Sequence, residues 1–370
     1  MNPTERDLAE KILLTSFPNE LKPLKQTDID TLNKFKDGSF GFSYLGIMLY
    51  ANGCNEKGKS TEHPQGLIYY DGETIFGVGF FKKDLEEKVG HLHIVAPRGG
   101  NWLKTVNKFI EKSRTISPLF QNSVYIRHLH DQQYQDLIKD GYKSIDSDPW
   151  HLVAPSEDET YNHRFIKIDE IVDCSNGEIV VKCLSTNDSK NFRRKAKMAY
   201  NRFANFLERN SLSYQIEEYN PAQHAELAKK MVVEHFRTLK NAVGSTPQDY
   251  FNLVNFMPED LGNDLTGYIG FLVGNGEKIP VALFMGEKIG TDTMALYATF
   301  ALRNEPCISE KFDPTGYTAI SQYSYIRIFE LLSKREFKYA DLGGSEVEDL
   351  NDFKRQLGAN EKMTYWAVKN

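Results

Sequence analysis

Two adjacent glycines near the carboxy-terminal end are surrounded by acidic side chains that can take part in proton transfer. Gly343 and Gly344 follow the predicted strand 339–342 and precede Ser345 and Glu346. A Gly-Gly pair lets the backbone turn sharply after a buried strand, although a simple turn would use it in the same way. Carboxylates beside such a turn can orient a polar group or accept its proton. The candidates are Asp341, Glu346 and Asp349, and each also fits a helix cap or a surface acid.

A strongly basic segment lies between residues 188 and 208. Its apolar residues recur at steps of three and four, as they do on one face of a helix. This apolar stripe consists of Phe192, Ala196, Ala199, Phe203 and Phe206. A helix packed through the stripe presents a cationic face to the phosphates of a nucleic acid, or is an ordinary solvated amphipathic helix. The phosphate-binding candidates are Arg193, Arg194, Lys195 and Lys197.

A third candidate is a short turn between a predicted strand and a predicted helix in the first half of the chain. Arg98, Gly99, Gly100 and Asn101 form this turn. Exposed N–H groups at a helix start bind anions, and an arginine adds paired donors that match a phosphate. The turn therefore suits a cofactor pyrophosphate, although a short Gly-Gly helix start is also a common structural feature.

Other patterns that carry chemistry are incomplete. Two pairs of histidines stand at alternate positions, where two imidazoles can share a strand face and bind a metal. The pairs are His91 with His93 and His128 with His130, and without a third ligand in a rigid motif we expect no metal site. The four cysteines stand singly, which favours reduced thiols. No serine nucleophile elbow, Walker loop or Rossmann fingerprint follows a predicted strand, which disfavours serine hydrolases, P-loop enzymes and NAD enzymes.

Composition places the chain among soluble globular proteins. It has 370 residues, of which 40% are hydrophobic and 26% charged, enough for about two domains of roughly 150–200 residues each. The formal net charge of −6 argues against a protein that is basic all over but leaves room for a local basic patch. No apolar run approaches the ~18–20 residues that span a bilayer. With the polar amino-terminus and isolated cysteines, this predicts a cytoplasmic protein without a membrane span.

The elements that must position these residues follow one order in both halves. The first half predicts a hairpin over 67–81 with its turn at Asp71-Gly72, then a strand at 91–95, a helix from 102, a strand at 124–126, a helix over 131–139 and a strand at 142–145. The second half predicts a meander over 268–300, a helix over 317–331, a strand at 339–342, a helix over 350–357 and a strand at 363–368. We take the acidic, proline-bearing stretch 146–160 as the connection between the two halves.

This element order resembles the GNAT acyltransferase fold, repeated in tandem. The expected fold class is therefore α/β, with mixed sheets in two GNAT-like domains, residues 1–155 and residues 156–370, the second carrying the basic helix 190–208. The segment from Tyr339 to Ala359, with its strand, Gly-Gly turn, Phe353-Lys354 helix and following glycine, is similar to the end of tandem-GNAT aminoacyltransferases. Fem-type peptidoglycan enzymes and the catalytic domain of lysyl-phosphatidylglycerol synthases are the two closest groups.

The resemblance implies roles for individual residues. In such enzymes an amine attacks an aminoacyl ester on tRNA, and the lysine of the Phe-Lys pair lies near the reacting ester. Here that residue is Lys354, whose charge would stabilise the tetrahedral oxyanion, while Phe353 could stack on a terminal base of the donor. The alternative is that Phe353 belongs to the core and Lys354 is a solvated helix lysine.

The chain also departs from the family pattern. The loop before the central helix of the second half begins with Arg303 and lacks the glycine-rich sequence of a coenzyme A site, whereas the turn from Arg98 to Asn101 in the first half comes nearer to it. The leading prediction is an acyltransferase that moves an aminoacyl group from aminoacyl-tRNA to a small-molecule or peptide amine. The alternatives are an acyl-coenzyme A-dependent N-acyltransferase and a non-catalytic ligand-binding protein of the same fold.

Overall fold

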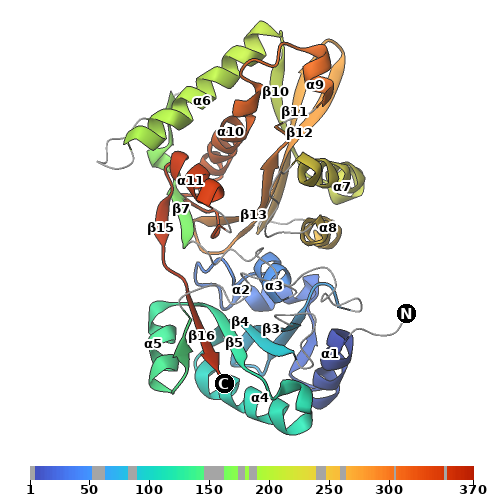
Figure 1. The fold of residues 1–370 in the computed structure, drawn as a ribbon, viewed down its shortest axis with the longest axis vertical. Coiled ribbons are helices and arrows are strands. Elements are labelled where there is room, and N and C mark those ends of the chain that lie inside the picture. The colour runs from blue at the N-terminus through green and yellow to red at the C-terminus, as the bar shows by residue number, and fades with distance from the viewer. Residues whose placement is uncertain are drawn as a thin grey trace. The chain divides into compact units, whose positions relative to one another are not determined.

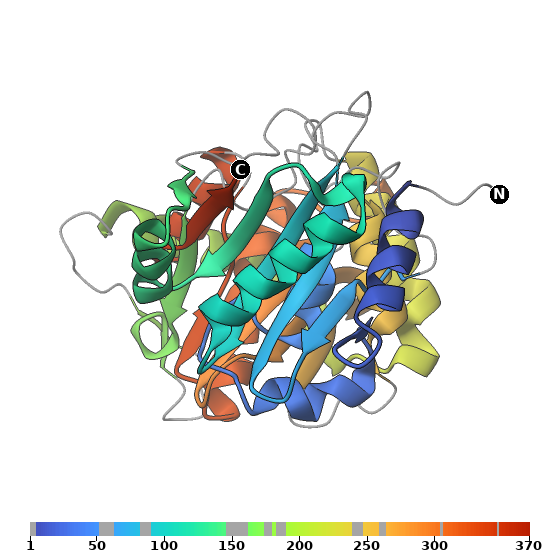
Figure 2. The same cartoon turned by 90° about the horizontal axis from the view of Figure 1, so that it is seen from below.

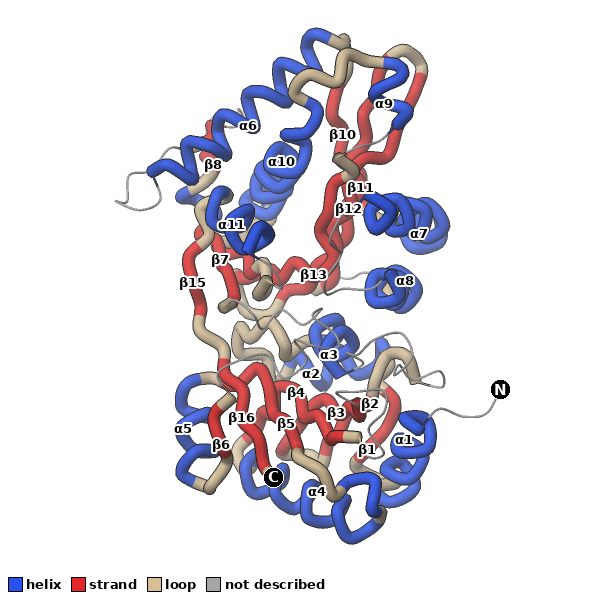
Figure 3. Tube along the Cα trace, in the orientation of Figure 1, coloured by secondary structure: helices blue, strands red, loops and turns tan. Residues whose placement is uncertain are grey.

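The computed structural model resolves into two compact units, and the carboxy-terminal strand of the chain belongs to the first of them. The structure describes residues 5–51, 63–81, 90–145, 162–173, 180–182, 190–238, 247–258, 264–303, 306–345 and 348–370. The first unit comprises Met1–Asn162, Val243–Phe256 and Met363–Asn370, and the second comprises His163–Ala242 and Met257–Lys362. Each unit contains a seven-stranded sheet, coloured red in Figure 3.

The sheet of the first unit is mixed. Its strand order is β1 (Leu21–Pro23), β2 (Leu67–Tyr70), β3 (Thr74–Phe81), β4 (His91–Gly99), β5 (Val124–Leu129), β16 (Tyr365–Lys369) and β6 (Lys143–Ser144). The pair β4 and β5 is parallel, whereas the other neighbouring pairs are antiparallel. A parallel pair needs a crossover connection, which α4 (Trp102–Ile116) supplies.

Helices cover both faces of this sheet. The apolar side chains of α1 (Glu5–Ser16) and α4 pack into one core with the strands, including Leu13, Val106 and Phe109. Figure 2 shows α4 lying across the strands on this face. On the other face, α3 (Tyr44–Ala51) packs so closely that a Cβ on Gly79 would lie 2.1 Å from the Ala51 carbonyl oxygen. The remaining helices of this unit are α2 (Ile29–Asn33), α5 (Asp131–Lys139) and α8 (Pro247–Phe256).

The second unit repeats the plan. Its sheet has the order β10 (Ser213–Glu218), β11 (Leu265–Gly274), β12 (Glu277–Lys288), β13 (Thr293–Ala301), β14 (Tyr339–Asp341), β7 (His163–Lys167) and β15 (Asn360–Lys362), and a separate small pair is β8 (Val172–Asp173) with β9 (Val180–Val181). Its helices are α6 (Lys190–Arg209), α7 (Pro221–Thr238), α9 (Pro306–Lys311), α10 (Ile320–Lys334) and α11 (Glu348–Gln356). Figure 1 shows α6 and α10 on one face of β10–β13 and α7 on the other.

In each unit two parallel strands pair briefly and then separate. In the first unit β4 and β5 pair from Leu92 with Val124 to Val95 with Arg127. In the second unit β13 and β14 pair only from Thr293 with Tyr339 to Ala295 with Asp341. Beyond Ala295 an extra residue, Tyr297, shifts the register of β13 against β12. Such a bulge bends and twists a strand, so it directs β13 away from β14.

In each sheet, a strand that is distant in sequence pairs with the second strand of the parallel pair. β16, at the carboxy-terminal end, lies between β5 and β6 of the first sheet, and β7, which follows the first half, lies between β14 and β15 of the second. The expected strand at 363–368 is therefore present as β16, and it joins the sheet of the first unit. Apolar periodicity predicts where a strand is and carries no information about which sheet it joins.

The predicted α/β fold class is confirmed, because each unit has a mixed sheet covered by helices. The predicted hairpin, the crossover helices, the meander and the basic helix all occur, and the basic helix is α6, from Lys190 to Arg209. The division into domains at residues 155 and 156 stays a prediction about which parts fold independently.

Deleting residues 363–370 should unfold part of the first unit. The deletion removes β16 from between two strands, and it removes Trp366, whose ring centroid lies 4.3 Å from the guanidinium of the fully buried Arg127. A desolvated cation–π contact contributes about 2 kcal/mol, in addition to the lost strand pairing. Hydrogen-exchange mass spectrometry should show faster exchange in β5 and β6 and unchanged exchange in β10–β12.

The matched control is Met363→Ala, which changes an exposed side chain just before β16 and should leave exchange as in the wild type. Wild-type protection of β5 in the deletion variant would contradict the placement of β16 between β5 and β6.

Candidate functional site

The Gly-Gly turn of the second unit begins where β14 leaves β13. Gly343 has a φ of +67°, a conformation that residues with a Cβ rarely adopt. Its N–H donates to Asp341 Oδ1 at 3.0 Å, and its carbonyl oxygen accepts from the Arg164 N–H at 2.9 Å. The turn is therefore hydrogen-bonded to its own strand and to β7. The positive φ of Gly343 explains why a glycine stands at this sharp turn.

Lys354 of α11 is buried against this turn. Its side chain is 5% exposed, and its Nζ donates to the carbonyl oxygens of Gly343, at 3.3 Å, and of Gly344. A buried ammonium needs such acceptors, because desolvation without them is costly. The structure thus brings together the three residues that the sequence singled out, and it gives the lysine a fixed position inside the turn rather than a solvated one.

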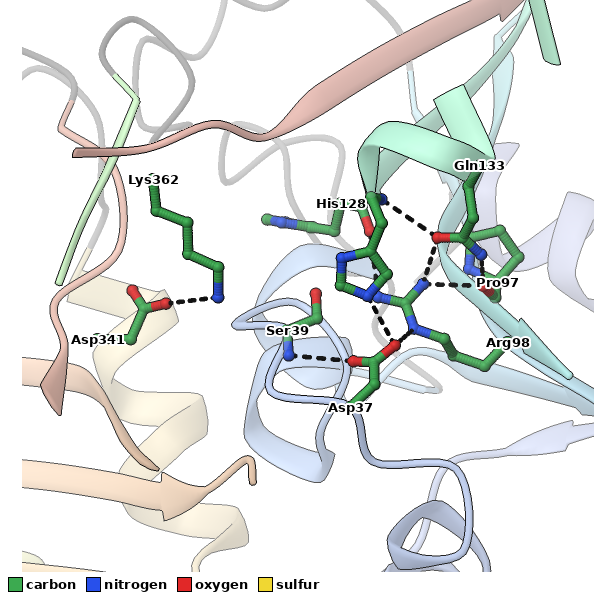
Figure 4. A network of polar contacts seen from close by, with 9 residues as sticks. Asp37, Ser39, Pro97, Arg98, His128, Gln133, Asp341 and Lys362 are labelled. Atoms are coloured by element: carbon green, nitrogen blue, oxygen red, sulfur yellow. Dashed lines mark hydrogen bonds and ion pairs between the residues drawn. The ribbon is translucent and has the colours of Figure 1, made fainter. Parts of the chain in front are cut away.

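Asp341 is anchored on several sides. It is 1% exposed, and Lys362 Nζ lies 3.5 Å from Oδ2 (Figure 4). His163 Nδ1 lies 3.7 Å from Oδ1. Burial alone raises the pKa of Asp341, but His163, Lys362 and the Gly343 N–H together hold it below its ordinary value. A carboxylate with a lowered pKa is a weak proton acceptor, so this geometry favours a positioning role over that of general base.

Ser345 adds a polar group that no protein atom satisfies. Its side chain is fully buried, and its Oγ has no hydrogen-bond partner among the described residues. A buried hydroxyl without a partner is costly, and a bound ligand is one of the ways in which it becomes satisfied. Glu346, the other acid that the sequence proposed for catalysis, lies outside the described residues.

The ring of Phe353 contacts other residues than those that Lys354 contacts. Its half-buried ring meets the ring of Tyr325 on α10 edge-on, with centroids 5.4 Å apart. The guanidinium of Arg303, just beyond the end of β13, lies 5.6 Å from the Phe353 centroid. The helix α11 therefore connects the Gly-Gly turn, through Lys354, with the end of the separating strand, through Phe353.

Arg303 and His235 are site residues that sequence reasoning missed. The Nε of Arg303 donates to Ser321 Oγ at 2.9 Å, and His235 of α7 stacks on Phe300 of β13 with ring centroids 4.3 Å apart. Burial and then the charge of Arg303 lower the pKa of His235 to about 4. The imidazole is therefore neutral at pH 7. The position of Arg303 at the end of a predicted strand was the available signal, and nothing in the sequence linked His235 to it.

The basic helix α6 packs on the core of the second unit as the stripe predicted. Phe203 and Phe206 are fully buried, and burying each contributes roughly 1.5–3 kcal/mol. Arg194 and Lys195 are exposed and Lys197 is half-buried, so these three basic residues lie on the outer side of the helix. The side chain of Arg193 lies outside the described residues.

In the first unit Arg98 is buried and surrounded by internal acceptors. Its Nη1 donates to the Pro97 carbonyl oxygen at 2.8 Å and to Gln133 Oε1 at 3.1 Å, and its Nε forms an ion pair with Asp37 (Figure 4). Asp37 Oδ2 also lies 2.7 Å from His130 Nε2. Burial alone raises the pKa of Asp37, but His130 and Arg98 outweigh it and hold the pKa below its ordinary value.

The segment that carries Asp37 fills the space where β4 and β5 separate. A Cβ on Gly41 would lie 2.2 Å from the His128 ring, and the fully buried Phe42 has the Arg98 guanidinium 5.3 Å from its ring centroid. The Tyr50 ring lies 4.2 Å from that of His128. Because a carboxylate and aromatic rings occupy this region, Arg98 fits a cofactor pyrophosphate poorly.

The other residues of the predicted cofactor turn lie at the start of α4. A Cβ on Gly99 would lie 2.1 Å from the Glu73 carbonyl oxygen, so this glycine allows a close backbone approach to β3. Asn101 Nδ2 donates to Glu73 Oε2 at 3.1 Å. Gly100 and Asn101 border an open hollow of about 590 Å³ whose lining also includes Lys104, Lys108 and Asp136. Their cofactor role stays a prediction.

Two further searches concern metals and membranes. Within the described ranges, no group of three or more His, Cys, Asp or Glu side chains is placed to hold a metal ion. Among the helices in the part of the chain that the structure describes, none is long and apolar enough to cross a bilayer.

Solved structures with the same fold include two of the predicted types. A conserved protein of unknown function from Bacteroides thetaiotaomicron VPI-5482 is 14% identical, with a TM-score of 0.62 over 95% of this chain and 99% of that chain. FemX is 11% identical, with a TM-score of 0.55 over 94% and 96%. The C-terminal DUF2156 domain of a protein described as a lysylphosphatidylglycerol synthetase, from Agrobacterium fabrum, is 10% identical, with a TM-score of 0.51 over 93% and 92%.

These likenesses extend over nearly the whole chain and confirm the predicted resemblance at the level of fold. No protein-family model matches the sequence, and a comparison with curated proteins gives no match.

Replacing Arg303 with glutamine should raise the pKa of His235. The charge of Arg303 disfavours the imidazolium, so its removal leaves burial as the remaining cause of the shift. The pKa should move upward from about 4 without reaching that of a solvated histidine. NMR titration of selectively labelled histidines measures it.

The control is Arg237→Gln, which removes an arginine that is already paired with Glu234 and should leave the His235 titration unchanged. An unchanged pKa in Arg303→Gln would show that the two side chains do not interact as described.

Proposed function

We propose that the protein transfers an aminoacyl group from aminoacyl-tRNA to an amine acceptor, at the Gly-Gly turn of the second unit. The observation that carries this proposal is the buried ammonium of Lys354, held by the Gly343 and Gly344 carbonyl oxygens beside the unsatisfied hydroxyl of Ser345. A cation fixed before the reaction can stabilise developing negative charge without reorganising, which is the main source of electrostatic catalysis.

The reaction needs an amine, an ester and a place for the proton. The amine nitrogen attacks the ester carbonyl carbon, a C–N bond forms, and the carbonyl oxygen becomes an oxyanion. The C–O bond to the ribose then breaks, and the proton lost by the amine is returned to the ribose oxygen. In this proposal Lys354 stabilises the oxyanion and Ser345 binds the reacting ester or the amine.

The other site residues have supporting roles in the proposal. Asp341 holds the turn through the Gly343 N–H and orients the lysine that it faces on β15, Lys362. Glu346 remains the candidate that accepts the amine proton. Phe353 packs between Tyr325 and Arg303. In the proposal, the donor contacts the part of the Phe353 ring that these two neighbours leave uncovered.

The basic helix supplies a surface for the donor. Arg194, Lys195 and Lys197 lie on the outer side of α6, and Arg193 belongs to the same run. Phosphate contacts of this kind give affinity without sequence specificity and depend strongly on salt. In a protein with a net charge of −6, a local cationic face selects nucleic acid more clearly than it would in a basic protein.

The acyl-coenzyme A alternative has less support. Its best feature is the open hollow beside Gly100 and Asn101, whereas Arg98 donates to internal acceptors and faces the Asp37 carboxylate. Calorimetry with coenzyme A separates the two functions, because binding that is lost in Asn101→Ala would favour the alternative.

Lys354→Met should lower transfer at least a hundredfold, because the preorganised charge is lost while the side-chain volume is kept. It should also destabilise the second unit by roughly 1–3 kcal/mol, since the Gly343 and Gly344 carbonyl oxygens each lose the lysine donor and, among the described residues, only that of Gly343 keeps another, the Arg164 N–H. Transfer of a radiolabelled aminoacyl group from charged tRNA to a panel of small amines and peptides measures the first effect, and urea unfolding measures the second.

The control is Lys338→Met, which removes an exposed lysine paired with Asp292 and should leave transfer unchanged. Folded Lys354→Met protein with wild-type transfer would remove Lys354 from the mechanism. Absence of transfer in the wild type with every acceptor, despite RNA binding, would favour the non-catalytic binding protein.

Changing Arg194, Lys195 and Lys197 together to glutamine should weaken tRNA binding and reduce its salt dependence. Each lost phosphate contact lowers the slope of log affinity against log salt by about 1. The slope should therefore fall by up to about 3, measured by filter binding between 50 and 200 mM salt. Removing three lysines that already pair with carboxylates, Lys229, Lys278 and Lys334, is the matched control. Equal effects of both triple changes would argue against α6 as the RNA surface.

A further inference from the structure

Arg303 is an accessible cation on an aromatic support. Its side chain is exposed, its guanidinium lies over the Phe353 ring, and its Nε donates to the hydroxyl of Ser321, which is 5% exposed. The bond at Nε restrains the guanidinium, and neither Nη group donates to an acceptor among the described residues. An arginine held in this way presents a pre-oriented pair of donors.

Arg303 differs from several other arginines of this unit in having no acidic partner. Arg209 pairs with Asp313, Arg237 with Glu234 and Arg355 with Asp352. Among the described residues, no carboxylate lies within ion-pair distance of the Arg303 guanidinium, which instead contacts Ser321 and Phe353. An organised cation without a counter-ion is the arrangement that an external anion completes.

Two titratable neighbours of Arg303, His235 and Tyr325, are uncharged at neutral pH. His235 feels the charge of Arg303, and it is neutral at pH 7 because burial and this charge lower its pKa to about 4. Tyr325, a second titratable neighbour, is neutral as well, because burial raises its pKa to about 12. Of these two described neighbours, neither carries a negative charge at neutral pH that would compensate the guanidinium.

The position of Arg303 connects it with the proposed reaction site. It follows the end of β13, the strand that separates from β14, and its aromatic support, Phe353, is the residue before Lys354. A group bound at Arg303 would therefore lie beside the helix that carries Lys354 to the Gly-Gly turn.

We infer that Arg303 binds an oxyanion of the substrate, a carboxylate or a phosphate, and so determines which substrates reach the Gly-Gly turn. This inference rests on the proposed function for its biological meaning, but the anion site itself exists whether or not transfer occurs. The loop after Arg303 lacks the glycines of a coenzyme A site, so the anion is held by this side chain on its aromatic support.

The test follows the His235 Cε1–H resonance at pH 7 while inorganic phosphate or acetate is added at constant ionic strength. In the wild type the resonance should shift and saturate, because His235 responds to the charge beside it. Arg303→Gln should weaken the apparent affinity at least tenfold, and Arg303→Lys should retain part of it, since a lysine keeps the charge and loses the paired donors. Arg237→Gln, whose arginine already has a carboxylate partner, should behave as the wild type.

A competition arm identifies the source of the anion. A short RNA ending in CCA that raises the apparent dissociation constant for phosphate would assign the oxyanion to the donor. An RNA that binds without this effect would assign it to a carboxylate of the acceptor. A wild type without saturable shifts, or an Arg303→Gln protein with wild-type affinity, would overturn the inference. Failure of aminoacyl transfer with intact, Arg303-dependent anion binding would instead count against the proposed function alone.

Discussion

The contact on which the account depends is the one between the Lys354 ammonium and the carbonyl oxygens of Gly343 and Gly344. A lysine that is 5% exposed must satisfy its donors inside the protein, and two carbonyl oxygens in succession can do so only where the backbone turns sharply. The positive φ of Gly343 supplies that turn, and the Gly343 N–H bond to Asp341 fixes where it begins. The Lys354 ammonium, the Gly-Gly turn and the Asp341 carboxylate therefore form one connected network, and a change in any of them disturbs the other two.

This network lies where two parallel strands of the second sheet separate. β13 and β14 pair over three residues, after which the register shift at Tyr297 directs β13 away and the chain after Asp341 is free to turn. The first unit has the same separation of β4 and β5 but fills it with its own side chains, chiefly Asp37, Phe42 and Tyr50. The same backbone plan thus leaves an anchored cation with an unsatisfied hydroxyl in one unit and a closed polar network in the other.

Much of this arrangement could be predicted from the sequence because it depends on local rules. The Asp71-Gly72 turn, the phenylalanine stripe of α6 and the strand–Gly-Gly–helix order around Lys354 all follow from periodicity and turn chemistry. The partners of Arg98 could not be predicted, because Asp37 and Gln133 are distant in sequence and their approach depends on tertiary packing. The placement of β16 in the first sheet was missed for the same reason. His235 was missed because its altered pKa arises from burial and from Arg303, neither of which leaves a sequence pattern.

The most direct test of the central claim is a crystal structure of the protein with a non-hydrolysable aminoacyl-adenosine in which an amide replaces the reactive ester. We expect the aminoacyl carbonyl at the Gly343–Ser345 turn, with its oxygen toward Lys354 and with a hydrogen bond to Ser345 Oγ. An analogue bound instead at the Arg98–Asn101 turn of the first unit, or bound in the second unit without contact to this turn, would contradict it.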